Sequence, residues 1–348
     1  MVDVVFNKRK MRMEELKEVC NSLLVQDAES DGIDLNIHPM TIGEYYMSDV
    51  FRQKTVLQKV KYGKALKNGG GFLDGKTGDV FIFIDKLAKW ENIYSARKLA
   101  AIIFAVYHEY RHLLQFSGNV SSLDRVLIDI EKRKNVVMFN DYLRNHDAFF
   151  IEIDANLYAI RRTREYFKKY ALDMYDEADE FLNPREDIAN FYLNNFDFQL
   201  FFDEFYEMCE DNNIRISKFN SPILNVFYDD DNHFRTLEEI LELSKMCEVD
   251  REILYGVLGS YSFLEQLEYE SLKDEERKLI FKVLNGVIQD EGRRLNVNKQ
   301  LYDDGKISKK MYLSLCDSAS EKTTYYIDKR DQVSVKRDVK PFVKMKKM

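Results

Sequence analysis

The stretch Tyr107-His108-Glu109-Tyr110-Arg111-His112 contains the spacing H-E-x-x-H, and it decides how the chain around it must fold. It follows an apolar run, residues 99–106, in which the apolar side chains recur at steps of three and four, as in an amphipathic helix. Because residues four apart share a helix face, His108 and His112 can bind one metal ion, at about 2.0–2.1 Å per bond for zinc. Glu109 would then lie beside the ion and take a proton from a metal-bound water.

Composition sets limits on the class of protein. The 348 residues are 45% apolar and 32% charged, as in a soluble globular chain. The chain contains only four prolines and fourteen glycines, and so few helix-breaking residues favour a helix-rich fold. The net charge of −8 opposes a general affinity for nucleic acid, so no nucleic-acid partner is expected. The longest apolar run is too short to span a bilayer, which predicts a cytoplasmic protein that does not enter a membrane. The four cysteines lack paired spacing and are expected to be reduced thiols: Cys20, Cys209, Cys247 and Cys316.

Three segments before the metal motif predict a helix and a small sheet. Residues 10–26 carry a narrow apolar stripe, typical of a helix that packs on the outside of a domain. Residues 33–37 alternate apolar with polar side chains, as in a half-buried strand that His38-Pro39 would end. Residues 72–84 predict a hairpin whose second arm, Val80–Ile84, leads toward the metal helix. The hairpin is thus a candidate sheet edge beside the metal motif, where an extended peptide could be added as a further strand.

A third metal ligand is expected in the segment 151–159. A hydrolytic zinc site usually has three protein ligands and one position for water, and Glu152 is the best candidate for the third. If the segment is helical, Asn156 lies one turn beyond Glu152, where its side-chain oxygen could accept the spare N–H of a ligand imidazole. His146 and Asp147 are the alternatives for the third ligand.

The two motifs together resemble those of a known group of enzymes. His108-Glu109-x-x-His112 followed by E-x-D-A-N-x-Y-A at residues 152–159 resembles the gluzincin metallopeptidases, and among them the ImmA/IrrE-type proteins, over about residues 75–165. The resemblance implies a zinc ion held by His108, His112 and Glu152, with Glu109 as the base and Asn156 as support. It also implies a compact α+β fold, an edge strand beside the active-site helix and a proteinaceous target.

The rest of the chain has a different composition. We expect a zincin-like metallopeptidase domain with a small sheet over residues 1–172, an all-helical region over 173–328, rich in aromatic and acidic residues, and a basic tail over 329–348. The tail carries eight Lys or Arg against two Asp. His233, in an acidic stretch, is expected to be a surface histidine, although metallopeptidases also use such a residue to stabilise an oxyanion.

The function expected is zinc-dependent hydrolysis of a peptide bond in an intracellular protein, by metal-activated water with Glu109 as general base. The alternative is a non-catalytic zinc-binding regulatory protein whose helical half binds a partner. An open fourth coordination position would favour the enzyme, whereas a fourth ligand from the chain, such as His146, would favour the structural site. Neither the identity of the substrate nor the oligomeric state follows from the sequence.

Overall fold

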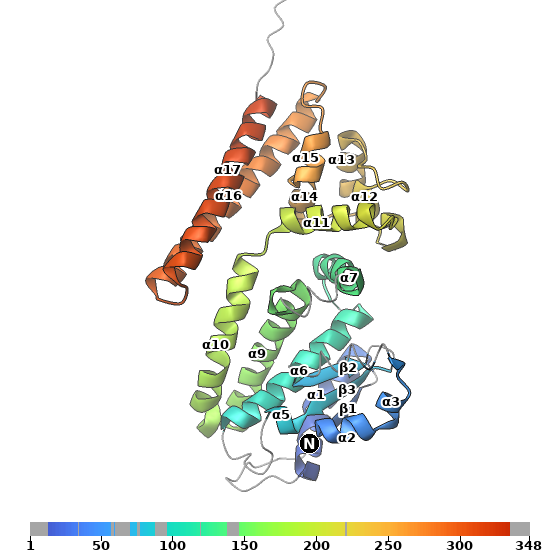
Figure 1. Cartoon of the computed structure of the whole chain (residues 1–348), viewed down its shortest axis with the longest axis vertical. Helices are drawn as coiled ribbons and strands as arrows, with labels where there is room; N and C mark the ends of the chain where they lie inside the picture. Colours follow the sequence, from blue (N-terminus) through green and yellow to red (C-terminus); the bar gives the residue numbers. More distant parts are fainter. Residues whose placement is uncertain are drawn as a thin grey trace, which may run out of the picture. The chain divides into compact units, whose positions relative to one another are not determined.

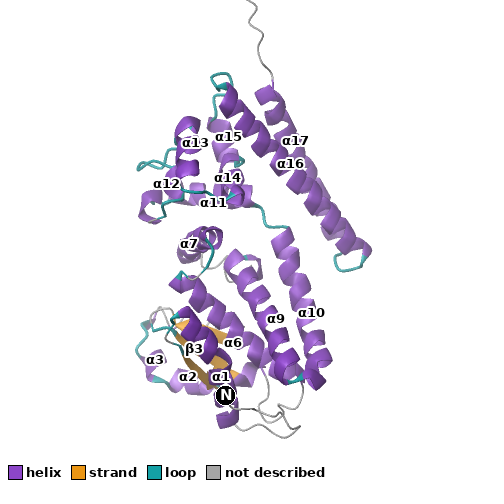
Figure 2. Cartoon of the chain, turned by 180° about the vertical axis from the view of Figure 1, so that it is seen from behind, coloured by secondary structure: helices purple, strands orange, loops and turns teal. Residues whose placement is uncertain are grey.

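The computed structural model describes residues 13–33, 35–56, 59, 70–74, 77–87, 96–118, 120–137, 146–219 and 221–334. The chain divides into two compact units, residues 1–193 and 194–348, and each is described by itself. The first unit holds a small sheet among helices and the second is helical (Figures 1 and 2). The predicted α+β class is therefore confirmed.

The sheet of the first unit has three strands, β1 (Asn36–Met40), β2 (Gly71–Asp74) and β3 (Asp79–Phe83), in the order β1-β3-β2. Strands β2 and β3 pair antiparallel as the expected hairpin, and β1 pairs parallel with β3. The hairpin was expected to lie at a sheet edge beside the metal motif, and its first arm, β2, is an edge strand of the described sheet. Its second arm, β3, lies between β2 and β1.

Strand β1 begins and ends about three residues later than its sequence pattern indicated. His38 and Pro39 lie inside the strand instead of ending it. Proline is tolerated there because, among the described strands, β1 has a neighbour on one side only, so Pro39 needs no ladder hydrogen bond toward the other side. His38 stacks on Phe81 and lies 3.1 Å from Asp79 Oδ1, so it supports the pairing of β1 with β3.

The helices of the first unit cover the sheet and carry the metal motif. They are α1 (Met13–Asp31), α2 (Ile42–Met47), α3 (Asp49–Arg52), α5 (Ile84–Leu87), α6 (Ala96–Ser117), α7 (Ser122–Val137), α9 (Phe150–Tyr170) and α10 (Tyr175–Asn194), with short 3-10 turns at His146–Ala148 and Leu172–Met174. Helix α6 is the central one, and it packs along α9 and against β2 and β3.

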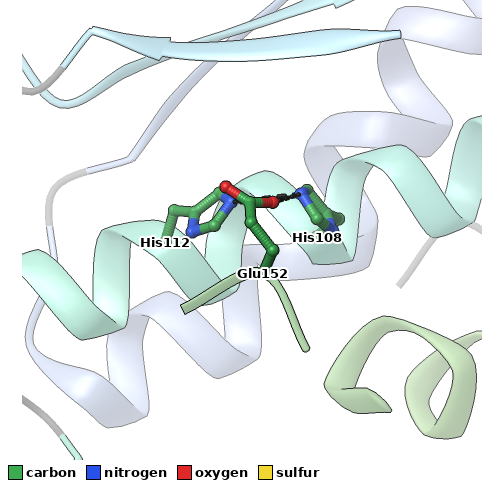
Figure 3. Close-up of side chains that lie close together, drawn as sticks. All are labelled: His108, His112 and Glu152. Carbon is green, nitrogen blue, oxygen red and sulfur yellow. Dashed lines mark hydrogen bonds and ion pairs between the residues drawn. The ribbon is translucent and has the colours of Figure 1, made fainter. Parts of the chain in front are cut away.

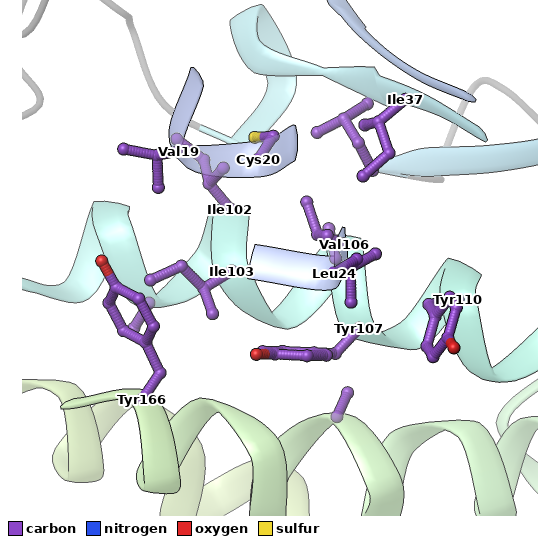
Figure 4. Close-up of a cluster of buried hydrophobic side chains, with 14 of the residues drawn as sticks. Val19, Cys20, Leu24, Ile37, Ile102, Ile103, Val106, Tyr107, Tyr110 and Tyr166 are labelled. Carbon is purple, nitrogen blue, oxygen red and sulfur yellow. The ribbon is translucent and has the colours of Figure 1, made fainter. Parts of the chain in front are cut away.

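The core of this unit forms around the apolar run of α6, as its spacing predicted. Ile102, Ile103 and Val106 are fully buried against the sheet side and α9 (Figure 4). Cys20 and Leu24 of α1 are also 0% exposed and belong to the same cluster. The first helix thus packs against the domain through its narrow apolar stripe, while positions such as Glu18 and Glu29 stay exposed, as its sequence pattern indicated.

Helix α10 belongs to the first unit, so the two units divide after residue 193 and not at the expected residue 172. Its Ala178 is buried in the core around α6. Arg164 of α9 pairs with Asp179 at 2.6 Å and with Glu186 at 2.8 Å, both on α10. These ion pairs join two helices, and the change in residue composition along the chain does not indicate which helices pack together.

The second unit consists of helices in the described residues. They are α11 (Phe198–Asp211), α12 (Leu224–Phe227), α13 (Leu237–Met246), α14 (Arg251–Leu258), α15 (Tyr261–Gln266), α16 (Asp274–Asp303) and α17 (Lys309–Ser334), with a 3-10 turn at Ile216–Phe219. The expected basic tail begins inside α17, and its residues 335–348 lie outside the described part of the chain. None of the described helices combines the length and apolar character that crossing a bilayer requires.

Candidate metal site

Two neighbouring helices bring three ligand atoms together. His108 and His112 lie one turn apart on α6, and Glu152 reaches them from the first turn of α9 (Figure 3). The two Nε2 atoms are 3.1 Å apart, and Glu152 Oε2 lies 3.3 Å from that of His108 and 3.4 Å from that of His112. Ligands at about 2.0–2.1 Å from a tetrahedral ion are roughly 3.3–3.4 Å from one another. The group could therefore hold a metal ion.

The electrostatics of the three groups fit a cation. Glu152 is 2% exposed, and although burial favours the neutral acid, the histidines hold its pKa well below the usual range. Burial would lower the pKa of His112, but the carboxylates of Glu152 and Glu109 raise it to about 9. The site thus concentrates negative charge on buried donor atoms, which a metal ion, if bound, would neutralise in place of protons.

Gln115 orients the His112 ring. The Gln115 amide nitrogen donates to the Ile151 carbonyl at 3.0 Å and to Asp154 Oδ2 at 2.7 Å, and both of these atoms can only accept. The remaining amide oxygen therefore faces His112 Nδ1, at 2.8 Å, and accepts its N–H. With the proton on Nδ1, the lone pair of Nε2 points to the centre of the three ligands.

Asp154 links this amide to an arginine on the metal helix. Arg111 Nε donates to Asp154 Oδ2 at 2.7 Å and its Nη2 to Oδ1 at 3.2 Å, a bidentate pair. Arg111 also stacks over the Tyr158 ring at 5.3 Å. These contacts join α6 to α9 at Asp154, two positions beyond Glu152, so they help to fix the distance between the helices that supply the ligands.

Glu131 of α7 holds the start of the helix that carries Glu152. Its carboxylate oxygens accept from the backbone N–H of Phe150 at 2.7 Å and of Ile151 at 2.8 Å. The residue before the helix, Phe149, provides no side-chain cap, so Glu131 satisfies first-turn donors that would otherwise be open. Burial raises the pKa of Glu131 to about 7.

Glu109 is buried beside the edge strand. A Cβ added at Gly71 of β2 would lie 2.8 Å from both Cγ and Oε1 of Glu109, so the backbone of β2 passes directly over this carboxylate. Burial raises the pKa of Glu109, against the opposing influence of His108 and His112. A raised pKa suits a group that must take up and release a proton near neutral pH.

The other predicted residues take different positions. His146 lies 3.2 Å from the second oxygen of Glu152, Oε1, and does not join the three ligand atoms. Asp147 contacts His146 at 3.5 Å. Among the described residues, no hydrogen bond joins Asn156 to either ligand histidine. His112 Nδ1 is hydrogen-bonded to Gln115 instead, and His108 Nδ1 is without a hydrogen-bond partner. His233 belongs to the second unit, where its 76% exposed side chain lies beside Asp229, as a surface histidine should.

Sequence reasoning missed Gln115, Glu131 and Gly71. Gln115 had a usable signal, because it stands three positions after His112 and therefore shares its helix face. Glu131 and Gly71 had none, since both act through contacts between segments far apart in the chain.

Comparison of the chain with models of known protein families, with curated proteins and with solved structures finds no match.

Proposed function

We propose that this protein is a zinc metallopeptidase. The observation that carries the proposal is the triangle of His108, His112 and Glu152 donor atoms, 3.1–3.4 Å apart, with the buried carboxylate of Glu109 next in sequence to the first ligand. Two imidazoles and a carboxylate form a donor set that zinc accepts readily, and three protein ligands are typical of its catalytic sites. The substrate class that we propose is a protein or peptide.

The roles of the chain's own residues follow from their positions. His108, His112 and Glu152 would hold the zinc ion, which when bound polarises a carbonyl and lowers the pKa of water toward about 7. Glu109 takes a proton from the attacking water and passes it to the leaving amine. Gln115 keeps the His112 proton on Nδ1, and Glu131 keeps the first turn of α9 in place for Glu152.

Two substitutions test the proposal on full-length protein. Glu109→Gln keeps the size of the side chain and should leave zinc binding intact while hydrolysis of a fluorogenic peptide library is abolished. Glu152→Ala removes one of three protein bonds and a negative charge, so zinc occupancy should collapse at ordinary metal concentrations. Full activity of Glu109→Gln, or full zinc affinity of Glu152→Ala, would contradict the assignment.

The alternative is a regulatory protein in which the metal has a structural role. Such a site would be closed by a fourth ligand from the chain, and His146 was the candidate. Within the described residues, His146 faces Glu152 Oε1 instead, and no fourth histidine, cysteine or carboxylate joins the three ligand atoms. This arrangement supports the enzyme.

A further inference from the structure

Two aromatic rings extend the line of metal ligands along α6. Phe104, His108, His112 and Phe116 follow one another at steps of four and share one helix face; we call these four residues the metal ridge. Phe104 stacks on His108 with ring centroids 5.9 Å apart, and Phe116 stacks on His112 at 6.3 Å. Phe116 is 44% exposed. The ridge therefore presents a ring on each side of the metal pair.

A cation from a different helix lies over each of these rings. At the Phe104 end, the guanidinium carbon of Arg185, on α10, is 6.0 Å from the Phe104 centroid and 3.6 Å from that of Phe181. At the Phe116 end, Lys132 Nζ, on α7, is 4.7 Å from the ring centroid. Cations over aromatic faces are held in place by the ring quadrupole.

The two cations differ in how far they are neutralised. Arg185 donates to the Phe181 carbonyl at 2.8 Å, and no ion pair joins it to a carboxylate in the described part of the chain. Burial and the charge of Arg97 lower its pKa. By contrast Arg111, which also stacks on a ring of this unit, has a bidentate carboxylate partner. Lys132 Nζ lies 3.5 Å from both Asp129 Oδ1 and the Gln115 carbonyl oxygen, and burial lowers the pKa of this lysine.

Arg185 places a positive charge without a carboxylate partner, among the described residues, at the Phe104 end of the metal ridge. The two charges of a bound ion would be offset by Glu109 and Glu152, Lys132 has Asp129 beside it at 3.5 Å, and Arg185 has no carboxylate partner in the described part of the chain. This contrasts with the whole chain, whose net charge is −8. An acidic ligand is attracted to such a local field.

The length of the ridge sets the spacing of the ligand's charges. Phe104 and Phe116 are twelve positions apart (116 − 104), which corresponds to about 18 Å along a helix. An extended peptide advances roughly 3.3 Å per residue, so about five residues span this length. In Figure 3 a strand of the sheet passes by the three ligands in the direction of α6, as an extended peptide beside it would also run.

We propose that the site selects acidic peptides, with one carboxylate side chain received by Arg185 and a second, about five residues away, received by Lys132, so that the bond to be cleaved lies between them. This inference rests on the proposed function and deepens it by naming the substrate class. The aromatic rings of Phe104 and Phe116 would pack against the aliphatic parts of the same side chains.

The test is calorimetric titration of full-length, zinc-loaded Glu109→Gln protein with two blocked eight-residue peptides. One has glutamate at its second and seventh positions, and the other has glutamine there. We expect about fivefold tighter binding for each glutamate, the size of a solvent-accessible ion pair, and hence roughly 25-fold for both. The preference should weaken as salt is raised.

Variants locate the preference. Arg185→Gln and Lys132→Gln should each lower the preference for the glutamate peptide about fivefold. Arg185→Lys, which keeps the charge, should retain this preference. Arg161→Gln is the matched control, because Arg161 is an exposed arginine over a ring of the same unit, that of Tyr158, away from the metal ridge. Equal binding of the two peptides, or an undiminished preference in Arg185→Gln, would overturn the inference.

The same peptides separate this inference from the proposed function. Selective binding of the glutamate peptide without hydrolysis of either peptide by the unsubstituted protein would support the acidic ligand and count against the peptidase. Equal hydrolysis of both peptides would support the peptidase and overturn the acidic specificity.

Discussion

Gln115 is the residue through which the metal affinity of the site can be tested most directly. Replacing it with alanine removes three hydrogen bonds, to His112 Nδ1, to the Ile151 carbonyl and to Asp154. At about 1 kcal/mol of net stabilisation for each bond, the apo protein should lose roughly 3 kcal/mol of unfolding free energy. Zinc affinity should fall about 10–100-fold, the usual result of removing the partner that orients a ligand histidine.

The matched substitution Gln115→Glu separates these two effects. A glutamate keeps an acceptor for His112 Nδ1 but places a second carboxylate where the amide now donates to Asp154 at 2.7 Å. Stability should fall as in the alanine variant, because like charges this close repel, while zinc affinity should stay within about tenfold of the unsubstituted protein.

Zinc affinity is measured by competition with a chromogenic chelator, and stability by denaturant unfolding with excess EDTA. Asn156→Ala serves as the comparison, because its sequence position predicted the role that Gln115 fills at His112. If Asn156→Ala lowers zinc affinity as much as Gln115→Ala does, the reasoning from this hydrogen bond is refuted.

Three further predictions concern the surroundings of the site. Gly71→Ala should displace Glu109, 2.8 Å from the added Cβ, and reduce hydrolysis at least tenfold with zinc still bound, whereas Gly43→Ala, whose nearest atom is 3.8 Å away, should leave activity unchanged. Glu131→Ala leaves two buried backbone N–H groups without an acceptor and should lower the unfolding free energy by about 2–4 kcal/mol in denaturant titrations. A loss under about 0.5 kcal/mol would argue against the capping role of Glu131. Cys20, buried and with a pKa raised to about 12, should resist thiol reagents in the native protein, and rapid labelling would show that its helix is not packed in the core.

The sequence by itself determined the elements whose patterns are local. The metal helix follows from apolar residues at steps of three and four, and the pairing of His108 with His112 follows from one helical turn. The hairpin of β2 and β3 likewise follows from two short apolar runs about a glycine turn. Glu152 could be named from its residue type and neighbours, and the structure brings it to both histidines.

The tertiary structure alone decided what depends on contacts between distant segments. The parallel pairing of β1 with β3 made β2 the edge beside Glu109, and no local pattern specifies which strand a hairpin arm will meet. Glu131 caps a helix nineteen positions later, and Arg185 reaches Phe104 from α10. Periodicity reports which face of an element is buried but not its neighbour across that face, because side-chain packing between elements selects the partner.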